Sequence, residues 1–135
     1  MLTREADLIL RIVQFLAIPE NIGKGSTAKI IRQELGLPAI LLRNTLRGLA
    51  TAGVIESQRG RSGGVAIAEK TLGLTVLEVL NIMDNEASHA HLHAWRSDPG
   101  RNNDPVQELM LKAQSAVREI FDGTTVAQLA ARYKN

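Results

Sequence analysis

The stretch Leu35-Gly36-Leu37-Pro38 constrains the fold of this chain more than any other. An apolar-patterned segment precedes it, and another one follows it. Glycine is typical of the position just after a helix end, because it adopts left-handed backbone angles without strain. Proline is typical of the first turn of the next helix. The sequence therefore predicts two helices joined by a tight turn.

Both predicted helices are short and amphipathic. Ser26 or Thr27 caps the first helix, which runs to Leu35. Its buried side carries Ile30, Ile31 and Leu35. The second helix runs to about Ala52 and ends before Gly53. One inward stripe follows its helical period: Leu42, Leu46 and Leu49. The residues that lie away from this stripe are Ala39, Arg43, Asn44 and Arg47.

A short hairpin is predicted after the helix pair, with strands at 54–57 and 65–68. The loop between them carries Arg59, Arg61 and the pair Gly63-Gly64. A phosphate-binding loop is excluded, because its glycines stand between a strand and a helix and end in Lys-Ser or Lys-Thr. A plain hairpin explains the glycines but not the arginines. The wing of a winged helix-turn-helix explains both, because its arginines contact phosphates or a narrow minor groove.

The strongest helix pattern in the chain covers residues 105–122. Asp104 is its predicted cap, Pro105 occupies the first turn, and Gln107 reaches back to the cap. Apolar residues repeat at spacings of three and four along it: Val106, Leu109, Met110, Ala113, Val117, Ile120 and Phe121. One small domain offers little surface to cover so long a stripe, so we expect these residues to form the interface of a two-fold dimer.

Three other helices complete a mainly helical fold. Residues 3–17 carry apolar side chains on more than one face, which predicts a helix that is either central in the domain or shared with a second partner. Thr75 opens a helix with a capping box, and a last short helix begins near Thr124 or Thr125. The predicted parts are a winged helix-turn-helix DNA-binding domain over 1–85, a loop over 86–104, and a dimerisation helix with a C-terminal short helix over 105–135.

The composition fits a cytoplasmic protein, and its uneven charge would allow the first half to face a polyanion, although an imbalance of this size is also common by chance. Of the 135 residues, 44% are hydrophobic and only 3% aromatic, which indicates a helical core of Leu, Ile, Val and Ala. No apolar run approaches the roughly 20 residues that span a bilayer. Acids near the N-terminus argue against a secretory signal. The first 70 residues hold ten Lys and Arg against six Asp and Glu, whereas the remaining residues hold six against eight. The basic first half suits a nucleic acid.

Several segments of the chain, in their order and spacing, are similar to the Rrf2 family of bacterial transcription regulators. They are residues 2–7, "LRNTLRGLATAGVIES" (42–57), "RGRSGG" (59–64), "TLGLTVLEVLNIMD" (71–84), the long helix at 105–122 and "DGTTVAQL" (122–129). The resemblance covers nearly the whole chain. It implies a dimeric winged-helix protein in which the start of the recognition helix reads bases and a wing arginine enters the minor groove.

The resemblance assigns DNA contacts by position. The residues that it places on bases or in the minor groove are Pro38, Ile40, Arg43, Asn44 and Arg59. The helix pair and the wing add further candidates, which are Ser26, Thr27, Ala39, Arg47 and Arg61. Together these ten residues form the predicted DNA-binding set.

One departure from that family concerns its cofactor. Many members hold an iron–sulfur cluster with three cysteines before the long helix, and this chain has no cysteine. We therefore predict no cofactor and no cysteine-ligated cluster. The same segment carries His89, His91 and His93, whose imidazoles are chemically suited to zinc, copper or iron. A polar surface loop or packing at an interface also explains these histidines, so no metal site is assigned.

These features predict a sequence-specific DNA-binding regulator, a dimeric repressor that reads a near-palindromic operator. The alternative is a winged-helix module that binds another protein without specific DNA binding. An enzyme is not predicted, because the chain has no cysteine nucleophile, no Gly-x-Ser-x-Gly elbow and no paired acid motif. The expected regulatory input is a small molecule, a partner protein or an ion at the histidine segment.

Overall fold

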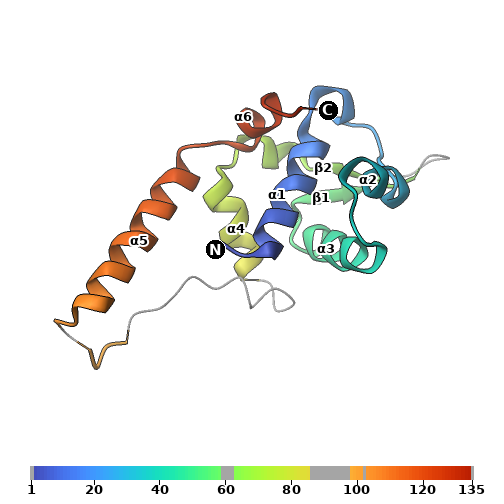
Figure 1. Ribbon diagram of the computed structural model, residues 1–135. Coiled ribbons are helices and arrows are strands. Elements are labelled where there is room, and N and C mark those ends of the chain that lie inside the picture. Colours follow the sequence, from blue (N-terminus) through green and yellow to red (C-terminus); the bar gives the residue numbers. More distant parts are fainter. Residues whose placement is uncertain (1, 59–62, 86–97, 102, 135) are drawn as a thin grey trace.

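The computed structural model describes residues 2–58, 63–85, 98–101 and 103–134 (Figure 1). Within these ranges the fold is mainly helical with one antiparallel hairpin, which confirms the predicted fold class. The elements in chain order are α1 (Arg4–Ala17), η1 (Pro19–Asn21), α2 (Ala28–Leu35), α3 (Ala39–Thr51), β1 (Ile55–Ser57), β2 (Val65–Ile67), η2 (Glu69–Gly73), α4 (Val76–Asp84), α5 (Pro105–Asp122) and α6 (Val126–Ala131). The short helices η1 and η2 lie in segments for which no helix was predicted.

Helix α1 is the centre of the hydrophobic core, as its broad apolar surface predicts. Its side chains Ile9, Ile12, Val13 and Leu16 are completely buried. Helices α2, α3 and α6 and the strand β2 all pack against α1, and Figure 1 shows α1 running through the middle of the molecule. A helix with neighbours on several sides needs apolar residues on more than one face.

The helix-turn-helix is formed by α2 and α3. Gly36 ends α2 in the left-handed conformation (φ 65°), and its N–H donates to the carbonyl of Arg32 at 2.8 Å. Pro38 is the residue before α3 rather than a member of its first turn, so the predicted helix start was one residue early. Thr27 caps α2 by accepting a hydrogen bond from the Ile30 N–H at 3.3 Å. The predicted tight turn is therefore present, with Gly36 at its predicted position and Pro38 one residue before the helix.

The buried faces of α2 and α3 differ from the predicted ones at a few positions. Ile31 is buried, but Ile30 is 44% exposed, so its placement in the core was wrong. In α3, Leu42 and Leu49 are buried as expected. Thr45, in the helical turn between them, is also buried. Its hydroxyl donates to the Leu41 carbonyl within the helix at 2.9 Å. A polar residue can be buried there because the helix backbone itself satisfies its hydroxyl.

The hairpin is anchored to the start of α2 by a third extended segment. Ile55 pairs with Ile67, and Ser57 pairs with Val65. Ser26 then pairs with Val65 from the other side, through hydrogen bonds of 2.8 and 2.9 Å between their backbones. This bridge fixes the base of the wing relative to the helix-turn-helix.

Helix α5 extends away from most of the described elements, and α4 packs beside it (Figure 1). Asp104 caps it as predicted, accepting from the Val106 N–H at 2.9 Å. Gln107 does not reach back to this cap, which corrects the prediction. Its amide instead accepts from the Asp98 N–H at 2.8 Å and donates to the Arg101 carbonyl at 3.0 Å. The side chain therefore closes the turn before α5.

The C-terminal residues return to the core beside α1. The Val76 N–H donates to the Thr124 carbonyl at 2.8 Å, and the Val126 N–H donates to the Leu74 carbonyl at 2.8 Å. The Gln14 side chain donates to the Leu129 carbonyl at 2.9 Å. These bonds attach the segment after α5 to α1 and α4, so the C-terminal end of α5 is held in a fixed position. No helix in the described ranges is long and apolar enough to cross a membrane.

Candidate nucleic-acid interface

One face of α3 carries no side chain of the core. Pro38, Ala39, Arg43, Asn44 and Arg47 are all exposed there. Ile40 lies with them and is 77% exposed, an unusual position for a large apolar side chain. These six residues belong to the predicted DNA-binding set, and the structure brings them together on α3 and the residue that precedes it. The surface combines hydrogen-bonding groups with an apolar side chain, as the edges of base pairs in the major groove require.

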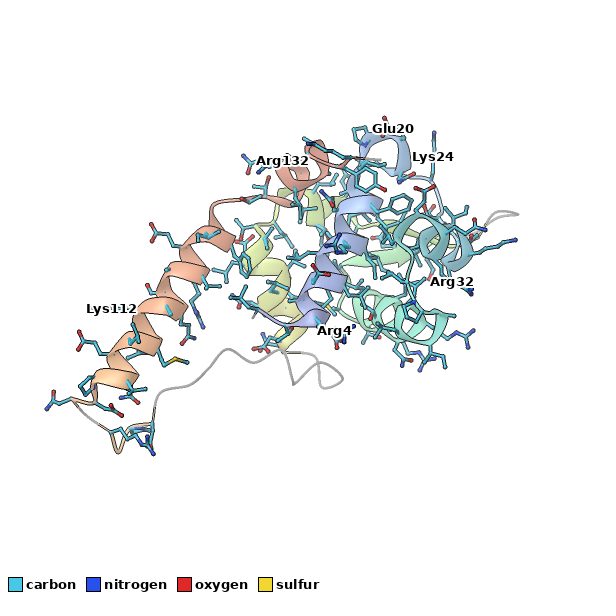
Figure 2. The ribbon with its side chains drawn as sticks, in the orientation of Figure 1. Arg4, Glu20, Lys24, Arg32, Lys112 and Arg132 are labelled. Atoms are coloured by element: carbon cyan, nitrogen blue, oxygen red, sulfur yellow. The ribbon has the colours of Figure 1, made fainter. Side chains whose placement is uncertain are left out.

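Helix α2 and the loop before it add a basic flank that the sequence argument missed. Lys24, Lys29 and Arg32 are exposed, and none of them makes an ion pair within the described part of the chain. Figure 2 shows Lys24 and Arg32 on the α2 side of the molecule, away from Lys112 on α5 and Arg132 on α6. Unpaired cations beside the exposed face of α3 are chemically suited to phosphate contacts. The i, i+3 spacing of Lys29 and Arg32, which places both on one side of α2, was the available sequence signal.

The two predicted contact residues at the N-terminal end of α2 differ in burial and in bonding. Thr27 is half-buried and uses its hydroxyl as the helix cap. Ser26 is only 5% exposed, and its backbone is engaged with Val65. A side chain that is buried in this way is poorly placed to reach DNA, so Ser26 serves the wing's attachment in the structure.

The wing is described at its base but not at its tip. The strands place Ser57 and Val65 at the outer end of the ladder, and the Gln58 N–H donates to the Gly64 carbonyl at 2.9 Å. Arg59 and Arg61, the two wing residues of the predicted set, lie outside the described residues. The base of the hairpin is nevertheless joined to α2 through Ser26.

The glycines of the wing have a structural role that the sequence argument did not identify. Gly63 and Gly64 both have positive φ, at 53° and 91°. A Cβ on Gly64 would collide with the backbone carbonyl of Ser26, and a Cβ on Gly25 would collide with the carbonyl of Gly63. The close approach that these glycines permit is therefore between two segments of the protein itself.

The apolar stripe of α5 divides into two parts. Val117 and Phe121 are half-buried, and Phe121 packs against the core. Val106, Leu109 and Ile120 are 66%, 67% and 68% exposed. With the exposed small residues Ala113 and Ala116 they form a seam at spacings of three and four, which we call the α5 seam: Val106, Leu109, Ala113, Ala116 and Ile120. Ala116 was absent from the predicted set, and Met110, at 38% exposed, lies on the same side of the helix as Val117 and Phe121.

The predicted metal candidates are not tested by the geometry. His89, His91 and His93 lie outside the described residues. Among the residues that the structure does describe, no group of three His, Cys, Asp or Glu side chains is arranged to hold a metal ion. The sequence contains no cysteine, so a cluster held by cysteine thiolates cannot be bound.

The sequence was compared with known families and proteins. The family described as Rrf2, iron-dependent transcriptional regulator, matches residues 2–132. The HTH-type transcriptional repressor NsrR of Streptomyces coelicolor is 25% identical over 130 residues, which cover 96% of this chain and 88% of that protein. The HTH-type transcriptional regulator CymR of Bacillus subtilis is 26% identical over 110 residues, which cover 81% of this chain and 75% of that protein.

Solved structures show the same fold. The structure of CymR, the global cysteine regulator of B. subtilis, superposes with a TM-score of 0.77 at 23% identity, covering 99% of this chain and 98% of that one. The IscR structure from T. potens gives a TM-score of 0.73 at 20% identity, covering 100% of this chain and 93% of that one. The predicted winged helix-turn-helix fold is thereby confirmed, and nearly the whole chain takes part in the likeness.

Proposed function

Because this chain belongs to the Rrf2 family of transcriptional regulators, we propose that it is a dimeric repressor that reads a near-palindromic DNA operator. Regulators of this family bind DNA, and the chain is not an enzyme. The observation that carries the proposal is the exposed face of α3, which presents Ile40, Arg43 and Asn44 together. In this motif, residues at the start of the second helix contact base edges in the major groove.

The chemistry of this face supports sequence reading rather than general attraction to DNA. An arginine guanidinium can donate two hydrogen bonds to one guanine, and an asparagine amide matches adenine. The exposed side chain of Ile40 is suited to the thymine methyl group, an apolar target that only the major groove offers. Arg47 and the basic flank of Lys24, Lys29 and Arg32 are suited to phosphates, which position the protein without selecting a sequence.

The wing completes the proposed contact surface. Its base is held beside α2 by the Ser26–Val65 bridge, so the loop that carries Arg59 and Arg61 starts from a fixed place. Arginine suits both phosphates and the negative potential of a narrow minor groove. We infer that Arg59 contributes to specificity and Arg61 mainly to affinity, because Arg59 is nearer to the strand.

The dimer is inferred from the α5 seam. Three large apolar side chains on this seam are at least 66% exposed in the single chain. An 18-residue helix is about 27 Å long, and its apolar stripe repeats as in helices that pair with a copy of themselves. Two chains joined along α5 would present two α3 helices to one duplex, which calls for an operator with two-fold symmetry.

The repressor assignment draws on a relative. NsrR of S. coelicolor is a transcriptional repressor, and it matches 96% of this chain. The signal that controls this protein must differ from a cysteine-ligated cluster, because the chain has no cysteine ligand. We infer that the input is a small molecule, a partner protein or an ion at the histidine segment.

The experiment is a fluorescence anisotropy titration of duplexes from the protein's own promoter region, at several salt concentrations. Binding through phosphates releases counterions, so the affinity for the operator should fall about a thousandfold or more between 50 and 200 mM salt. A shuffled duplex should bind more weakly at every salt concentration. Weak binding of all duplexes with no salt dependence would instead favour a winged-helix module that binds proteins.

A further inference from the structure

A hollow of about 720 Å³ lies where the C-terminal end of α1, η1, α2 and α6 meet. Figure 1 shows these elements gathered at the end of the molecule near the C-terminus, away from the free part of α5. Its lining includes the apolar side chains of Ile18 and Ile30, the aromatic rings of Phe15 and Tyr133, and the acids Glu20 and Glu34. The volume is in the range of small-molecule sites.

The lining explains why Ile30 is exposed. Its side chain, which the helical period assigns to the core, is 44% exposed because it faces this hollow. Phe15 and Tyr133 also line it, with ring centroids 6.0 Å apart and planes tilted by 58°. Phe15 is only 5% exposed, so the half-buried ring of Tyr133 is the main aromatic surface open to a ligand. Aromatic rings attract cations over their faces in addition to offering apolar area.

The charged side chains that line the hollow, among the described residues, are both acidic. Glu20 comes from η1 and Glu34 from α2, and the described lining contains neither Lys nor Arg. Figure 2 shows Glu20 at this end of the molecule, on η1. Neither carboxylate makes an ion pair with a described residue. Both are exposed, so water screens them, and each contributes only modestly to the preference for a cation over an anion.

A second hollow shows that this charge pattern is not general. It measures about 650 Å³ and lies beside the turn between α2 and α3. Its rim carries Arg4 and Arg11 together with Glu5 and Asp7, and Arg11 is paired with Asp7 at 2.8 Å. A rim with both signs favours neither a cation nor an anion.

We propose that the hollow between α1, η1, α2 and α6 binds an apolar organic cation, such as an aromatic amine or a quaternary ammonium or phosphonium compound. The apolar and aromatic lining provides the affinity, and Glu20 and Glu34 reject anions. Ile30 and Glu34 both lie on α2, the first helix of the helix-turn-helix.

Occupancy of the hollow is linked to DNA binding through α2, a step that rests on the proposed function. A ligand held between α2 and the α1–α6 side favours one placement of α2. That helix packs against α3 and is joined to the wing through Ser26. A ligand that prefers one placement of α2 changes operator affinity, and the operator changes ligand affinity by the same factor.

The site itself is tested by calorimetry without DNA, using tetraphenylphosphonium and tetraphenylborate, two ions of the same shape and opposite charge. The parent should bind the cation about tenfold or more tightly than the anion. The double variant Glu20→Gln with Glu34→Gln should lose most of this preference while keeping its circular dichroism spectrum. Equal binding of the two ions by the parent would overturn the proposal.

A filling variant locates the site. Ala131 lines the hollow and is exposed, so Ala131→Trp should occupy the space without disturbing the core, and cation binding should fall about tenfold or more. Ala127→Trp is the matched control, because Ala127 is also exposed on α6 but does not line the hollow. Unchanged cation binding in Ala131→Trp, with the fold intact, would place the ligand elsewhere and overturn the proposal.

The link to DNA is tested by repeating the operator titration with saturating tetraphenylphosphonium. The operator Kd should shift about fivefold or more in the parent and in Ala127→Trp, but not in Ala131→Trp. An unchanged operator Kd with the cation bound would overturn the proposed coupling to DNA binding, but it would not contradict the proposed cation site. Absence of operator binding would remove the proposed function and the link together, whereas the calorimetry would still decide the site.

Discussion

Gly64 attaches the wing to the start of α2, and an alanine there should be costly. Its φ of 91° is unfavourable for any residue with a side chain, and a Cβ would press on the backbone of Ser26. We expect Gly64→Ala to lower the free energy of unfolding by about 2–3 kcal/mol, measured by urea denaturation.

Gly63→Ala is the control for this prediction. Gly63 also has positive φ, at 53°, but nothing lies within 4 Å of a Cβ built on it. Its substitution should cost only the backbone strain, about 1–2 kcal/mol. Equal losses in the two variants would mean that contact with Ser26 does not constrain the wing.

Arg43 is exposed on α3, so its removal should affect recognition and leave the fold unchanged. We expect Arg43→Ala to weaken operator binding by about 1–3 kcal/mol and to relax the preference at one base pair. Anisotropy titrations with the operator and with single-base variants, all at one salt concentration, measure both effects.

Thr51→Ala provides the comparison on the same helix. Thr51 lies at the far end of α3, and its hydroxyl donates only to the Arg47 carbonyl at 2.9 Å. Its removal should leave operator affinity unchanged. If Arg43→Ala behaved like Thr51→Ala, this face of α3 would not be the reading surface.

At the scale of elements, the boundaries of helices could be predicted from the sequence, whereas the elements that pack against each helix could not. Gly36, Pro38, Thr75 and Asp104 mark element boundaries because capping involves only residues close in sequence. Ile30 was misplaced because helical periodicity shows which residues share a face but not what covers that face.

Hydrogen bonds to residues of other segments could likewise not be predicted from local sequence patterns. Gln107 has the spacing of a capping partner, yet its amide bonds to Asp98 and Arg101 in a turn whose geometry the sequence does not reveal. The basic flank on α2 was missed for a related reason, since single cations on a short helix are common on any solvated surface.

The α5 seam should be the dimer interface, and charges placed on it should separate the chains. Leu109 and Ile120 are 67% and 68% exposed, so the double variant Leu109→Glu with Ile120→Glu removes little contact within the single chain. Burying four carboxylates in a paired seam is unfavourable. Light scattering at micromolar concentration should show a dimer for the parent and a monomer for the variant, with unchanged helix content.

Leu111→Glu tests whether position on α5 matters. Leu111 is 45% exposed but lies two residues from Leu109, on a different side of the helix. This variant should remain a dimer. A parent that is monomeric, or a Leu111→Glu variant that dissociates as readily, would contradict the seam.

At the scale of the whole molecule, the packing of the C-terminal residues is what the linear sequence least reveals. Val126 and Ala130 of α6 belong to the same core as Ile9 and Ile12 of α1. The bonds of Thr124 and Val126 to the segment around Leu74 hold the end of α5 at a defined place. The orientation of α5 relative to α3 is consequently set by the core, and the distance between the two α3 helices of a dimer should be fixed.

A fixed distance between the two α3 helices predicts strict spacing of the operator half-sites. The half-sites should lie about one helical turn apart, since both recognition helices then enter the same side of the duplex. Inserting about five base pairs, half a turn, would rotate one half-site to the opposite side. Anisotropy should then show affinity reduced to that of a duplex with a single half-site. The monomeric α5 variant should bind the parent and spaced operators equally weakly. If the inserted operator bound the parent protein as tightly as the original, the two α3 helices would not be held rigidly by the core and α5.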